Sequence, residues 1–112
     1  MEHYPHAFQS MRAALVQAWI DSDRGVLDTA QTHFESLEQA IPNPYESAWA
    51  TVGRVVTATR AGDPPVPHVT AIEHARQTLG AFPLSYRYEL AVVDEWLEHH
   101  ADTLRTASTP RP

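Results

Sequence analysis

The sequence predicts an all-α fold of about five antiparallel helices, packed as stacked helical hairpins or as a small helical bundle. Apolar residues recur at spacings of three and four along almost the whole chain, and no long stretch alternates with period two. Proline, glycine and asparagine interrupt this pattern at intervals that suit helices of ordinary length. Because 112 residues can enclose only one hydrophobic core, we expect a single helical domain over residues 1–105.

The first two helices are predicted from two apolar stripes that precede residue 42. Each stripe covers one face of a helix and leaves the opposite face polar, as expected for a helix at the surface of a core. The first stripe consists of Phe8, Met11, Leu15, Ala18 and Trp19. The second consists of Leu27, Ala30, Phe34, Leu37 and Ile41.

The third helix is predicted to begin in the segment Asn43-Pro44-Tyr45-Glu46. Asparagine caps a first turn, proline suits the first helical position, and Glu46 can reach back as in a capping box. Gly53 lies inside this helix, where glycine costs about 1 kcal/mol relative to alanine, so we expect a close helix contact there. The apolar stripe consists of Tyr45, Ala48, Trp49, Val52 and Val56.

Two further helices are predicted after Gly62 and the proline-rich segment 63–67, which together end the third helix. The fourth helix begins either near Pro67 or near Thr70, and Ser85 is a candidate cap for the fifth. The fourth stripe consists of Val69, Ile72, Ala75, Leu79 and Phe82. The fifth consists of Tyr86, Leu90, Val93, Leu97, Ala101 and Leu104. Residues 106–112 have no apolar side chain to bury beyond one alanine and are predicted to form a disordered tail.

Composition and charge argue against several classes of protein. The chain has no cysteine, which excludes disulfides, thiolate metal ligands and cysteine nucleophiles. The net charge is −6 and the arginines are dispersed, so we expect no nucleic-acid partner. The chain has neither a secretory signal pattern nor a run of about 18 apolar residues, so we expect a cytoplasmic protein that does not enter a membrane. No glycine-rich phosphate loop or serine nucleophile motif is present, and no cofactor is predicted.

The sequence also contains an internal similarity. Shifting the chain by 41 residues aligns segment 26–61 with segment 67–102 and gives eight identical pairs, including Pro42 with Pro83 and Tyr45 with Tyr86. This spacing has two interpretations. The segments are two copies of one helix–turn–helix hairpin, or they are unrelated amphipathic hairpins that share a proline at the turn.

One part of this pattern resembles the tetratricopeptide repeat. The residues that carry the resemblance are Ala30, Phe34, Leu37 and Pro42, which follow the spacing of small, aromatic and proline positions in the second helix of that repeat. The resemblance covers residues 11–44 and, more weakly, 45–83. It implies a right-handed stack of hairpins whose groove binds a peptide or a partner helix. The spacing of 41 residues differs from the family's period of about 34, and Asp21 stands where the family has an aromatic residue.

The stretch DEWLEHHAD, residues 94–102, is the densest cluster of titratable residues. On a helical wheel Glu95, His99 and Asp102 share the face opposite the core, a pattern typical of a solvated helix face with surface pairs. As an alternative, these three residues bind a metal ion, together with His3 and His6 from the N-terminus, and make the chain a metal-binding protein or a metal-dependent enzyme. That alternative is weaker because a metal site needs ligands from a second helix, and no paired histidine motif provides them.

Two predicted helices carry apolar residues outside their main stripes. These residues are Val16 and Ile20 in the first helix and Val92 and Trp96 in the last. Apolar side chains outside the stripe that faces the core indicate either that the helix is sandwiched between two neighbours or that it presents a surface to a partner. We therefore expect a small non-catalytic interaction module that binds a protein partner, or a second copy of itself, through these four residues.

Overall fold

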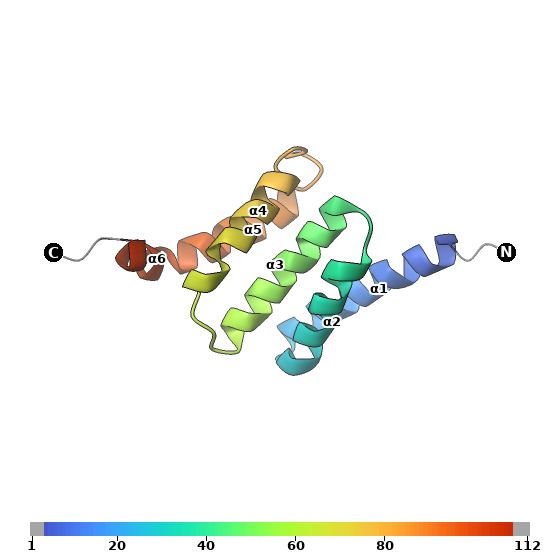
Figure 1. Cartoon of the computed structure of the whole chain (residues 1–112), viewed down its shortest axis with the longest axis horizontal. Coiled ribbons are helices and arrows are strands. Elements are labelled where there is room, and N and C mark those ends of the chain that lie inside the picture. Colours follow the sequence, from blue (N-terminus) through green and yellow to red (C-terminus); the bar gives the residue numbers. More distant parts are fainter. Residues whose placement is uncertain (1–3, 109–112) are drawn as a thin grey trace.

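The computed structural model describes residues 4–108, with side chains for residues 11–106, and contains six α-helices and one short 3-10 helix (Figure 1). The helices are α1 (Tyr4–Asp23), α2 (Leu27–Ala40), α3 (Pro44–Arg60), η1 (Val66–His68), α4 (Val69–Leu79), α5 (Arg87–His99) and α6 (Ala101–Ser108). Residues 4–108 contain no β-strand, so the all-α prediction is confirmed. The α-helices number six rather than five, because the predicted fifth helix is divided in two.

Helix α3 is the centre of the molecule. It packs along α2 and along α4, and in Figure 1 it runs between α1 and α2 on one side and α4 and α5 on the other. Helix α1 packs on α2 and also contacts α3, and α5 packs on α4 and also contacts α3. Consecutive helices therefore form hairpins, and α1 and α5 both flank the same central helix.

The core consists of two apolar clusters, one on each side of α3. One cluster joins α1 and α2 to α3 around Phe34, and the other joins α4 and α5 to α3 around Ile72 and Val93. Each large apolar side chain that becomes fully buried stabilises the fold by about 1.5–3 kcal/mol. Trp19 and Trp49 pack against both clusters and connect them.

The start of α3 and the turns around it follow the predicted residues. The Asn43 side chain accepts hydrogen bonds from the backbone N–H groups of Tyr45 (2.8 Å) and Glu46 (3.2 Å), so the predicted cap is confirmed. Glu46 does not reach back to form a capping box, because its Oε2 accepts a hydrogen bond from Arg12 of α1 at 2.8 Å. Gly62 follows α3 with φ of 108°, a left-handed conformation that favours glycine.

The segment between α4 and α5 differs from the prediction. Helix α4 begins at Val69, after Pro67 has already contributed to η1, so its start lies between the two predicted positions. Phe82 lies beyond the end of α4 and is exposed, although the fourth apolar stripe included it. Ser85 is not the cap of α5: the residue before this helix is Tyr86, and no side chain caps it.

The last helix of the prediction is interrupted at one residue. His100 has φ of −102° and ψ of 10°, which ends α5, and α6 begins at Ala101. The apolar spacing continues across this residue, so the sequence pattern contains no sign of the interruption. Helix α6 continues to Ser108, two residues past the predicted start of the tail at Thr106, and the remaining tail residues lie outside the described range.

The described helices include none that is both long and apolar enough to cross a lipid bilayer.

Candidate functional site: a groove between α1, α3 and α5

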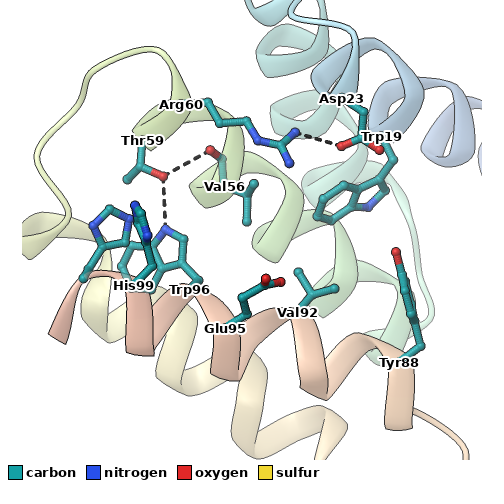
Figure 2. Close-up of a pocket in the computed structure, with 11 residues that line it drawn as sticks. Trp19, Asp23, Val56, Thr59, Arg60, Tyr88, Val92, Glu95, Trp96 and His99 are labelled. Atoms are coloured by element: carbon teal, nitrogen blue, oxygen red, sulfur yellow. Dashed lines mark hydrogen bonds and ion pairs between the residues drawn. The ribbon is translucent and has the colours of Figure 1, made fainter.

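An open cavity of about 420 Å³ lies where α1 and α5 flank α3 (Figure 2). We call it the three-helix groove. Its lining residues come from all three helices and from the residue that follows α5: Trp19, Asp23, Val56, Thr59, Arg60, Tyr88, Val92, Glu95, Trp96, His99 and His100. Ligand sites in proteins commonly combine an apolar, aromatic surface with a few polar groups, and this groove has that composition.

The aromatic wall of the groove is held in place by ring contacts between four helices. Trp19 of α1 stacks on Trp49 of α3 with ring centroids 4.4 Å apart, and the edge of Phe34 from α2 contacts it at 5.3 Å. Tyr88 of α5 meets Trp49 edge to face at 6.0 Å. Such pairs contribute about 0.5–1.5 kcal/mol each beyond area burial, so the wall is fixed before any ligand binds.

Gly53 of α3 makes this arrangement possible. A Cβ atom at this position would lie 2.2 Å from Cε1 of Phe34, far inside van der Waals contact. The absence of a side chain therefore lets the Phe34 ring lie against α3, where it is fully buried and supports Trp19. The close helix contact expected from Gly53 is confirmed, and its consequence is the position of the groove's main aromatic residue.

The polar rim between α1 and α3 is centred on Arg60. Its Nη1 donates to Asp23 Oδ1 at 2.9 Å and to the hydroxyl of Ser22 at 2.8 Å. Ser22 is buried and also accepts a hydrogen bond from the Thr57 hydroxyl at 2.8 Å. The exposed Arg60–Asp23 pair adds little stability, since such pairs contribute about 0–1 kcal/mol, but it engages the positive charge of Arg60.

Trp96, one of the four residues predicted to bind a partner, closes one end of the groove and is buried. Only 6% of its surface is exposed, and its Nε1–H donates to Thr59 Oγ1 at 3.0 Å. Of the two positions expected for such residues, Trp96 has the sandwiched one, because the side of α5 that appeared free on a helical wheel packs against α3. Trp96 therefore belongs to the core and contributes part of its ring to the groove.

His100 lies beside Trp96, with ring centroids 4.7 Å apart. Burial lowers the pKa of His100 below the usual value of 6.5, and the charge of neighbouring His99 lowers it further. Both effects favour the neutral form of the His100 imidazole at this end of the groove.

Glu95 is the one carboxylate of α5 that lines the groove, and Figure 2 shows it pointing into the cavity beside Val92. Within the described part of the chain it has no hydrogen-bond or ion-pair partner. Half of the other lining residues are apolar or aromatic: Trp19, Val56, Tyr88, Val92 and Trp96. The groove thus contains an unpaired negative charge beside an apolar surface.

The structure brings together only part of the predicted partner-binding set. Val92 and Trp96 line the groove, whereas Val16 and Ile20 are exposed on α1 next to Trp19 but outside the cavity. Sequence reasoning did not single out Tyr88, Asp23 or Arg60 as site residues. The sequence did contain a sign of the α5 side of the groove. Spacings of four, three and four residues place Tyr88, Val92, Glu95 and His99 on one face of a helix.

The alternative metal site is not assembled within the described residues. Glu95 and His99 line the same cavity, but Asp102 forms an ion pair with Arg105 on α6. Among the residues with described side chains, no group of three histidine, aspartate or glutamate residues is arranged to hold a metal ion. His3 lies outside the described residues, and the side chain of His6 is also outside them.

Comparison with known proteins identifies no relative. No family model matches the chain, and no curated protein or solved structure matches it significantly. The function must therefore be inferred from the groove itself.

Proposed function

We propose that this protein is a non-catalytic interaction module whose three-helix groove binds a short segment of a protein partner. The observation that carries this proposal is Tyr88, which is 70% exposed at the edge of a groove lined by Trp19, Val56 and Val92. Exposed tyrosine beside an apolar floor is typical of the centre of a binding surface, because tyrosine contributes contact area and a hydroxyl at low entropic cost.

The extent of the apolar surface supports the same proposal. Val16 and Ile20 are exposed on α1 beside Trp19, so apolar side chains continue from the groove onto the outer face of α1. An apolar area that extends across more than one helix is a recurrent feature of interaction sites. A segment that lies in the groove can therefore extend over α1.

The resemblance to tetratricopeptide repeats is a second reason for the proposal. Ala30, Phe34 and Leu37, which carry the resemblance, are all buried in the cluster between α1, α2 and α3. Stacks of such hairpins form concave surfaces that bind extended partners. We propose the same use for the side of the molecule where α1, α3 and α5 lie in succession. We also propose a cytoplasmic location, with which a chain without cysteine is compatible.

Peptide display tests this proposal directly. A library of random dodecapeptides is panned on the immobilised full chain, and the affinities of selected peptides are measured for wild type and for Tyr88→Asp. Because Tyr88 is mostly exposed, the substitution should leave the fold intact while adding a charge beside the groove. We expect it to weaken binding at least tenfold, since truncation of a central aromatic residue commonly costs about 2 kcal/mol or more.

Leu84→Asp is the matched control. Leu84 is 85% exposed in the segment before α5 and does not line the groove, so the same charge there should leave peptide affinity unchanged. Selected peptides that bind wild type and Tyr88→Asp equally well would contradict the proposal. Sedimentation of the free protein over a range of concentrations shows whether a second copy occupies the groove instead.

A further inference from the structure

The charge of the three-helix groove defines what kind of segment it accepts. Its lining includes two carboxylates, from Asp23 and Glu95, and one guanidinium, from Arg60. Arg60 is paired with Asp23 at 2.9 Å, which leaves Glu95 as the carboxylate without a partner among the described residues. The lining also includes the imidazoles of His99 and His100, and burial lowers the pKa of His100, which favours its neutral form.

The position of Glu95 suits a long cationic side chain. In Figure 2 its carboxylate points into the cavity, and the Val92, Val56 and Trp19 side chains surround the adjacent space. Lysine and arginine have an aliphatic stem that packs on apolar surface and a charged end group that pairs with a carboxylate. A guanidinium can also lie on an aromatic face such as Trp19 or Tyr88.

We propose that the three-helix groove binds a partner segment through an arginine or lysine side chain, whose charge pairs with Glu95 and whose stem packs on Val92 and Trp19. This inference rests on the proposed function, because it names the chemistry of the segment that the groove receives. The net charge of −6 favours the approach of such a segment from solution. An acidic segment would instead place a like charge beside Glu95.

Two tripeptides isolate the role of the charge. Acetyl-Leu-Arg-Leu-amide carries the proposed side chain, and acetyl-Leu-citrulline-Leu-amide has almost the same shape without the charge. Each is titrated into the full chain labelled with ¹⁵N and in its methyl groups, and the indole N–H of Trp19 and the methyl groups of Val92 are followed by NMR. We expect the arginine peptide to bind roughly threefold more tightly, the effect of one exposed ion pair.

Glu95→Gln should abolish the difference between the two peptides, because it keeps the shape of the side chain and removes its charge. Glu98→Gln is the matched control: Glu98 is exposed on the same helix and does not line the groove. The difference should persist in this variant and shrink in 1 M salt, where charges are screened over about 3 Å.

Three results would overturn the inference. The first is equal affinity of the two tripeptides for wild type, the second is an arginine preference that survives Glu95→Gln, and the third is signal changes confined to regions outside the groove. If Tyr88→Asp weakens the binding of display-selected peptides at least tenfold in these cases, the proposed function stands and only the proposed pairing with a cationic side chain is wrong. If that variant binds them normally, the proposed function fails as well.

Discussion

At the scale of single residues, Gly53 has a larger effect than its position inside a helix suggests. It gives the Phe34 ring room to lie against α3, and Phe34 contacts Trp19, the main aromatic residue of the groove. A glycine that is unfavourable for α3 alone is thus required for the packing of α2 and α1.

Gly53→Ala is expected to lower the free energy of unfolding by about 1–3 kcal/mol, as overpacking of a full core does. The helical preference of alanine, about 1 kcal/mol, is too small to compensate for a contact of 2.2 Å with a buried ring. Urea denaturation measures the change, and tryptophan fluorescence reports displacement of Trp19. Phe34→Leu added to Gly53→Ala should restore part of the loss; a single variant as stable as wild type would contradict this account.

His100 makes the stability depend on pH. Its folded pKa lies below the unfolded value of 6.5, because burial and His99 disfavour the charged form. Well above pH 6.5, the His100 imidazole is neutral in both the folded and the unfolded chain. Below it the unfolded chain binds more protons, so this residue lowers the free energy of unfolding as the pH falls through the window under 6.5. The other charged or titratable groups that line the same groove are Asp23, Arg60, Tyr88, Glu95 and His99.

His100→Gln should therefore reduce the loss of stability between about pH 7 and pH 5 that wild type shows. Urea denaturation at a series of pH values measures this slope. His33→Gln is the control, since His33 is exposed on α2 and contacts neither His99 nor the groove. An unchanged slope in His100→Gln would show that other groups cause the pH dependence.

At the scale of helices, α3 and α5 differ in whether a side chain caps their first turn. Asn43 caps two backbone N–H groups of α3, whereas α5 begins without a side-chain cap although Ser85 lies nearby in the sequence. The Asn43→Ala variant is expected to lose about 1 kcal/mol of stability. Ser85→Ala should change it by less than about 0.5 kcal/mol, since Ser85 is exposed and caps nothing. Thermal and urea unfolding of both variants test this, and equal effects would contradict it.

The helices themselves could be predicted from apolar spacing, because each stripe must face a core. The ends of the helices were less predictable where no capping residue, glycine or proline marks them in the sequence. The interruption at His100 leaves the spacing of Leu97, Ala101 and Leu104 intact, so the pattern reads as one helix. Phe82 fits the spacing of α4, yet it lies after the helix end and contacts Tyr45 edge to face at 5.3 Å.

At the scale of the whole molecule, the groove depends on how α1, α3 and α5 pack together. The spacing of apolar residues within a single helix does not determine this packing. Val92 was predicted as a binding residue because it lies outside the stripe of its own helix, and it does line the groove. The same criterion selected Trp96, which also lines the groove, although α3 covers most of its surface. This criterion did not select Trp19, because Trp19 belongs to the main apolar stripe of its helix. Its contact with both core clusters follows only from the arrangement of the neighbouring helices.

The central claim is that the three-helix groove receives the partner. The most direct measurement is a ¹H–¹⁵N NMR titration of the full chain with the tightest display-selected peptide. We predict that the largest signal changes occur at the indole of Trp19 and at the backbone amides of Arg60, Tyr88 and Val92. Largest changes on α2, or in segment 80–86, with unperturbed groove signals would contradict the claim.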